Sequence, residues 1–208
     1  MAAARSLART IALSLVLASP LAAQQGAQAI DSAYTRQIRE LTPTHPVHRF
    51  TTELVDYLPA SATVPTPLSV LGYVPGTIGR LSNVTEVNKY FRALAAASPR
   101  VKLMSLGTSD EGREMLVMAI ADEATIPRLD EYRQMLVRLS DPRSLAGAER
   151  EQIMAGAKPI YWLTGALHSP ETGSPEMLLE LAYRLAVDEG ETARKIRANV
   201  ITLITPIL

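Results

Sequence analysis

The 208-residue sequence predicts an α/β fold, in which helices pack against a β-sheet. Amphipathic helical segments alternate along the chain with short apolar runs that have the length of strands. Near the C-terminus the order is strand, helix, strand, which is typical of a crossover unit that joins two parallel strands. The length suits one domain with an export signal, or part of a larger domain.

The composition is that of a globular protein and excludes several classes of site. Hydrophobic residues make up 47% of the chain and charged residues 20%, which is enough to bury a core. Lys+Arg and Asp+Glu both total 21, and no basic stripe with interleaved aromatics is present, so we expect no nucleic-acid partner. The absence of cysteine excludes disulfides, thiol catalysis and cysteine zinc sites.

Residues 1–23 are predicted to be a signal peptide. Two arginines precede the apolar run Thr10–Ala18, and small residues follow it, with cleavage favoured after Ala23 and Ala27-Gln28-Ala29 as a second candidate. The apolar run is about half as long as the ~20 residues that a membrane span needs. We therefore expect an exported protein, periplasmic or secreted, with no membrane span after cleavage.

Residues 24–80 form a proline-rich N-terminal extension. Its six prolines exclude one continuous helix or an internal strand, because each proline fixes φ and removes a backbone donor. Short helices are predicted at Asp31–Glu40 and Thr51–Leu58, in an extension that lies across the surface of a domain. His45 and His48 fall here beside prolines, and we interpret them as solvated loop residues rather than metal ligands.

A regular pattern begins near residue 83. Ser82 or Asn83 can cap an amphipathic helix over Thr85–Ala97. Val101–Leu106 and Met115–Ala121 follow as strands, and the polar turn between them predicts an antiparallel hairpin.

The last part of the chain predicts the crossover unit. The run Pro159–Leu167 is almost continuously apolar, which favours a strand buried on both faces. A helix over Pro175–Val187 follows, with Ser174 as its expected N-cap, and the final strand is Val200–Ile204.

His168 and Glu171 follow the apolar strand directly. Open α/β sheets place their binding crevices at the carboxyl ends of strands. An imidazole nitrogen and a carboxylate oxygen both suit zinc, at about 2.0–2.2 Å. The spacing alone is a weaker signal than His-Glu-x-x-His, and Glu171 could instead favour the start of the helix through the helix dipole.

Three sequence blocks resemble, in order, the carboxypeptidase A-like zinc metallocarboxypeptidase family. Gly165–Glu171 resembles the zinc-ligand loop of that family, and Ser105–Arg113 resembles the turn of its first hairpin. Asn199–Pro206 resembles the strand that precedes the family's Asn-Pro-Asp-Gly segment. Residues 81–208 are thus identified as the N-terminal part of a zinc carboxypeptidase-like domain.

The resemblance implies a mixed, mostly parallel sheet of about eight strands with helices on both faces, here incomplete at the C-terminus. It implies a zinc site in which His168 and Glu171 are the first two ligands. The family's second histidine, catalytic glutamate and substrate-binding arginines lie further downstream, so no catalytic or substrate-binding residue is assigned. The chain ends directly after a hydrophobic strand, which suggests a fragment that is inactive by itself.

The activity that the resemblance implies is zinc-dependent hydrolysis at peptide or protein C-termini. Pro170 replaces the arginine of many digestive members, and Thr172-Gly173-Ser174 replaces an aromatic residue often found there, so the side-chain preference stays open. Residues 122–157, predicted as two solvated helices, form a large insertion that could shape a substrate site but is more simply decoration.

Two other functions remain open from the sequence. Zinc-dependent deacylases of N-acyl amino acids carry a similar Gly-x-x-His-x-x-Glu loop on a related scaffold. A non-catalytic exported binding protein could also keep the scaffold without the missing residues. The export signal and the hairpin residues Glu111-Gly112-Arg113 favour the peptidase.

Overall fold

The computed structural model describes residues 27–42, 56–141, 143 and 145–208. The predicted signal peptide and both loop histidines, His45 and His48, lie outside the described residues. Within the described part of the chain, no helix has the length and apolar character needed to cross a membrane.

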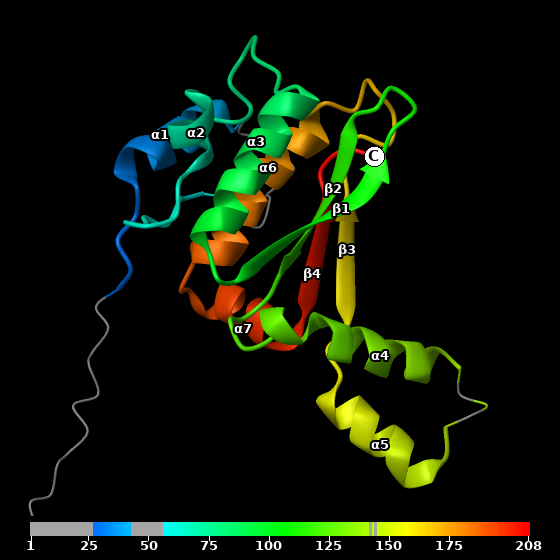
Figure 1. Cartoon of the computed structure of the whole chain (residues 1–208). Coiled ribbons are helices and arrows are strands. Elements are labelled where there is room, and N and C mark those ends of the chain that lie inside the picture. The colour runs from blue at the N-terminus through cyan, green and yellow to red at the C-terminus, as the bar shows by residue number, and fades with distance from the viewer. Residues whose placement is uncertain (1–26, 43–55, 142, 144) are drawn as a thin grey trace, which may run out of the picture.

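Four strands form one sheet in the order β1-β2-β4-β3 (Figure 1). The strands are β1 (Val101–Thr108), β2 (Glu114–Ile120), β3 (Ile160–Thr164) and β4 (Ile201–Thr205). The helices are α1 (Ser32–Leu41), α2 (Pro67–Leu71), α3 (Val84–Ala97), α4 (Leu129–Ser140), α5 (Gly147–Gly156), α6 (Gly173–Val187) and α7 (Glu191–Asn199), with a short 3-10 helix at Ile126–Arg128.

The strand directions confirm a mixed α/β sheet but correct one detail of the prediction. β1 pairs with β2, and β2 with β4, in antiparallel fashion, whereas β3 and β4 are parallel. The hairpin and the crossover unit are therefore both confirmed. The expectation of a mostly parallel sheet is wrong for the described strands. Two of the three strand pairs, β1–β2 and β2–β4, are antiparallel.

The apolar run before the predicted zinc loop had predicted a strand buried on both faces. That prediction is wrong for β3. Tyr161 is 63% exposed and Trp162 is 52% exposed. β3 is the last strand in the order, so among the described residues it has a neighbour only on the β4 side. The local sequence pattern of an apolar strand is the same at the edge and at the centre of a sheet.

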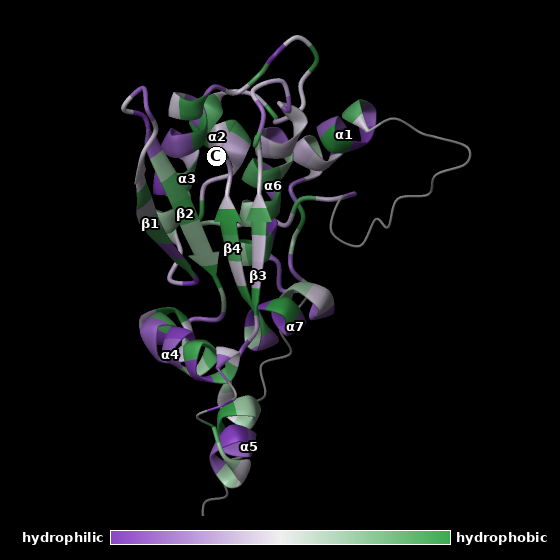
Figure 2. Ribbon diagram, turned by 90° about the vertical axis from the view of Figure 1, so that its right-hand side faces the viewer, coloured by the Kyte–Doolittle hydropathy of each residue, from purple (hydrophilic) through white to green (hydrophobic). Residues whose placement is uncertain are grey.

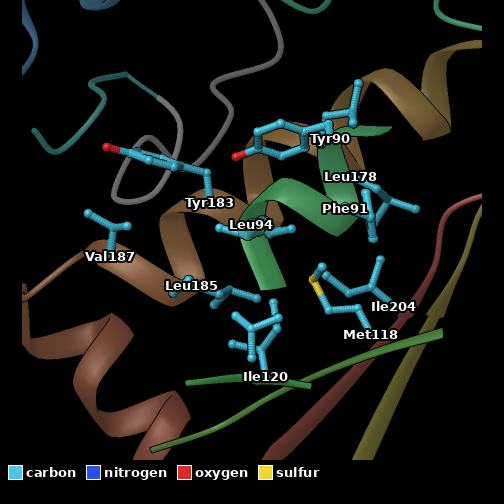
Figure 3. Close-up of a cluster of buried hydrophobic side chains, with 14 of the residues drawn as sticks. Tyr90, Phe91, Leu94, Met118, Ile120, Leu178, Tyr183, Leu185, Val187 and Ile204 are labelled. Carbon is cyan, nitrogen blue, oxygen red and sulfur yellow. The ribbon is translucent and has the colours of Figure 1, made fainter. Parts of the chain in front are cut away.

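The hydrophobic core lies between the sheet and two helices. α3 and α6 pack side by side against one face of the sheet (Figures 1 and 2). Phe91 and Leu94 of α3 meet Met118 of β2 and Leu178 of α6 in a fully buried cluster (Figure 3). A capping box fixes the start of α3, as predicted.

The N-terminal extension is part of this core. Tyr34 of α1 and Leu58 are fully buried in the same cluster as α3 and α6. The predicted helix at 31–40 is confirmed with a shift of one residue, with Asp31 as its N-cap. The second predicted helix, Thr51–Leu58, falls mostly outside the described residues, and Asp56–Leu58 is not helical.

The insertion at 122–157 forms α4 and α5, which project from the lower end of the sheet (Figures 1 and 2). Hydrogen bonds connect the beginning of this insertion to the residue that follows it. Lys158 Nζ donates to Asp122 Oδ2 at 3.0 Å and to the Thr125 hydroxyl at 2.5 Å. The loop after β3 lies at the opposite end of the sheet, which supports decoration over a substrate-shaping role.

Candidate metal centre

His168 and Glu171 lie in the loop that connects β3 to α6, at the carboxyl end of β3. Their side chains contact each other, with 2.9 Å between His168 Nδ1 and Glu171 Oε1. The other carboxylate oxygen accepts a hydrogen bond from the His168 backbone N–H at 3.1 Å. The His168 side chain is 70% exposed and that of Glu171 is 51% exposed, so solvent reaches both side chains.

The contact with His168 favours the ionised form of the Glu171 carboxyl. The hydrogen bond from the His168 side chain, followed by that from its backbone, lowers the pKa of the Glu171 carboxyl. A glutamate carboxyl is already ionised at neutral pH, and this shift favours the same form, which is the form that a metal requires. Because the folded pKa is depressed, the stabilisation from this pair exists above the unfolded pKa and disappears as the pH falls.

Ser174 ties the two ends of the ligand loop together. Its hydroxyl accepts a hydrogen bond from Ala166 N–H at 2.9 Å and donates to the Glu171 carbonyl at 3.2 Å. Ser174 is therefore not the N-cap that the sequence predicted. The N-cap is Thr172, and Ser174 is the second residue of α6.

The loop also contains backbone strain. Ala166 has a φ of 46°, and it is the only non-glycine residue with a positive φ in the described part of the chain. Such strained positions cluster at functional sites, where the surrounding structure holds them. The Ser174 hydroxyl, bonded to the Ala166 N–H, is part of that support.

Gly165 lies where the end of β3 closely approaches the segment after β4. Its N–H donates to Thr205 O at 2.9 Å, and its carbonyl accepts from Leu208 N–H at 3.2 Å. A Cβ at this position would lie 2.5 Å from Pro206 O and 2.9 Å from a methyl carbon of Leu178. Only glycine fits between the end of β3 and the segment after β4, three residues before His168.

Gly165→Ala is expected to destabilise the protein by about 2 kcal/mol, because overpacking of a closed contact forces backbone shifts. Urea unfolding followed by circular dichroism measures the change. Gly173→Ala is the matched control, since a Cβ at Gly173 meets nothing within 4 Å. Equal stability of the two variants would show that the contact at Gly165 relaxes without cost.

A cavity of about 710 Å³ begins beside the ligand loop, at Thr172 and Gly173, and continues along α6. The opposite wall is the loop Pro75–Leu81 of the N-terminal extension. The buried carboxylate of Glu176 holds this wall in place, because it accepts hydrogen bonds from the backbone N–H groups of Gly76 and Ser82. The sequence had suggested only that Glu176 could favour the start of the helix through the helix dipole, and it had not predicted these contacts.

The described residues contain no group of three or more His, Cys, Asp or Glu side chains that could hold a metal ion. His168 and Glu171 therefore stand as a pair. Their donor chemistry suits zinc, and the open sides of both groups leave room for further ligands. The zinc role of the pair stays a prediction.

Comparison with known proteins identifies the family. A family model described as zinc carboxypeptidase matches residues 87–208, more than half of the chain. Among solved structures, carboxypeptidase A from Helicoverpa armigera is similar, with a TM-score of 0.44 and 18% identity over 68% of this chain. The chain spans 30% of the length of that carboxypeptidase. The search of curated proteins found no match. On the family match, this chain belongs to the zinc carboxypeptidase family.

Proposed function

We propose that this chain is the N-terminal part of an exported zinc metallocarboxypeptidase that hydrolyses peptide bonds at the C-termini of peptides or proteins. The observation that carries the proposal is the contact between His168 Nδ1 and Glu171 Oε1, 2.9 Å apart in the loop after β3. This loop lies within the region that matches the zinc carboxypeptidase family.

In this proposal His168 and Glu171 hold the zinc ion. When bound, zinc supplies Lewis-acid chemistry, since it lowers the pKa of water toward about 7 and polarises a carbonyl. Gly165 and Ser174 keep the ligand loop in shape from its two ends. Because α6 begins at Gly173, two residues after Glu171, a displacement of α6 is expected to displace the carboxylate as well.

The 208-residue chain alone is expected to hydrolyse no peptide and to bind zinc weakly. Among the described residues no third His, Cys, Asp or Glu joins the pair, so an ion there has two of the three protein ligands that catalytic zinc sites use. Incubation of the purified chain with zinc and a peptide, followed by mass spectrometry, tests this. Measurable release of a C-terminal residue would contradict the proposed inactivity.

The substrate class is tested on the full-length peptidase with matched compounds. A peptide with a free C-terminus should be shortened, whereas the same peptide with an amidated C-terminus should be left intact. Hydrolysis of N-acyl amino acids without shortening of the peptide would identify a deacylase instead. Zinc binding without hydrolysis of either class would identify a binding protein.

A further inference from the structure

Gln28 connects the N-terminal extension to the end of α6. Its amide nitrogen donates to the Val187 carbonyl at 3.1 Å and to the Ala60 carbonyl at 3.3 Å. Its amide oxygen accepts a hydrogen bond from Glu189 N–H at 2.8 Å. Both donor hydrogens and the acceptor of this side chain are therefore used within the fold.

The backbone around Gln28 is equally engaged. Ala60 N–H donates to the Ala29 carbonyl, and Asp31 N–H donates to the Leu58 carbonyl, both at 2.8 Å. Between these two bonds, Ile30 pairs with Pro59 in an isolated β-bridge. The segment from Gln28 to Asp31 is thus an ordered strand-like part of the domain, and it leads directly into the N-cap of α1.

The hydrogen bond from Gln28 to the Val187 carbonyl is one of four that side chains donate to carbonyls at the C-terminal end of α6. The last carbonyls of a helix have no partner inside it. Here Arg197 donates to the carbonyls of Leu185 and Asp188, and Arg100 donates to that of Ala186. Gln28 supplies the donor for the remaining carbonyl in this series, at Val187.

We infer that the export signal is removed before Gln28, after Ala23, and that the mature protein keeps Gln28 as a structural cap of α6. The inference rests on the proposed export. Cleavage at the second candidate, after Ala29, would remove all three Gln28 hydrogen bonds and the Ala29–Ala60 pair. It would leave the Val187 carbonyl without this donor, so the fold distinguishes two processing sites that sequence alone leaves open.

The processing site is tested by expressing the full chain with its own leader in a bacterium with a periplasm and determining the N-terminus of the product. We expect the product to begin at Gln24. A product that begins at Ile30 would overturn the inference while leaving export intact. A product that begins at Met1 would overturn both the export proposal and the inferred processing site, and the stability comparison below would then test the structural role of Gln28 alone.

The structural role of Gln28 is tested on chains made without a leader, one beginning at Gln24 and one at Ile30. The shorter chain should melt at least about 4 °C lower, because it lacks the three hydrogen bonds of Gln28 and the Ala29–Ala60 pair. Gln28→Ala in the longer chain should reproduce much of this loss, and Gln134→Ala on the exposed face of α4 is the matched control. Equal melting temperatures for the two lengths would overturn the inference.

Discussion

His168→Ala in the full-length peptidase is expected to remove the zinc and the hydrolytic activity together. His168 Nδ1 and Glu171 Oε1 lie 2.9 Å apart, and both residues are zinc ligands in the proposal. Substitution of residues that merely support a ligand already lowers metal affinity or activity 10–100-fold. Loss of a ligand should exceed about 100-fold in kcat/KM, with zinc content falling well below one ion per chain.

Zinc content by elemental analysis and peptide hydrolysis, measured on the same sample, check this result. His48→Ala is the control, because the sequence predicts a solvated loop histidine there. Glu171→Gln separates the donor charge from the shape of the side chain, and it should also lose zinc, since a neutral amide binds the ion more weakly. A His168→Ala protein that retains normal zinc would refute the ligand assignment.

The parts of the fold that could be predicted from sequence are those determined by local patterns. The 3.6-residue period of α3 and its two cap candidates, Ser82 and Asn83, indicate the helix and its start, and the structure has the helix with Asn83 as its cap. The polar turn between two apolar runs predicted the β1–β2 hairpin. The position of His168 and Glu171 at the end of a strand followed from the order of the elements alone.

The remaining features depend on contacts between distant parts of the chain. An apolar run such as Ile160–Thr164 does not reveal whether a strand has one neighbour or two, so the exposure of Trp162 was not predictable. Ser174 has the residue type and position of an N-cap, yet its hydroxyl bonds Ala166 across the loop. The contact between Gly165 and Pro206 joins two segments far apart in sequence.

The role of Arg197 could not be predicted from the sequence of its own helix, α7. α7 has basic residues at 194, 195 and 197, a composition typical of a solvated helix. In the structure Arg197 is almost fully buried, and its Nη1 atom donates to the carbonyls of Leu185 at 2.8 Å and Asp188 at 2.6 Å. Its Nη2 atom pairs with Glu189 at 3.2 Å.

Arg197→Met should therefore destabilise the protein by about 3 kcal/mol. The methionine fills much of the volume, but the two carbonyls at the end of α6 lose their donor, and Glu189 keeps only Arg100 of its two arginine partners. Arg194→Met, on the exposed face of the same helix, removes the same charge without a buried contact and should change the unfolding free energy by less than about 0.5 kcal/mol. Chemical denaturation of both variants measures the difference.

A similar loss in the two variants would mean that net charge, rather than the cap on α6, determines the effect. The distinction bears on the site because α6 runs from the ligand loop to this cap, with Gly173 at one end and Val187 at the other. If the hydrogen bonds from Arg197 to the carbonyls of Leu185 and Asp188 fix the helix along its axis, Arg197→Met in the full-length peptidase should also lower zinc retention, although Arg197 lies at the opposite end of α6 from His168.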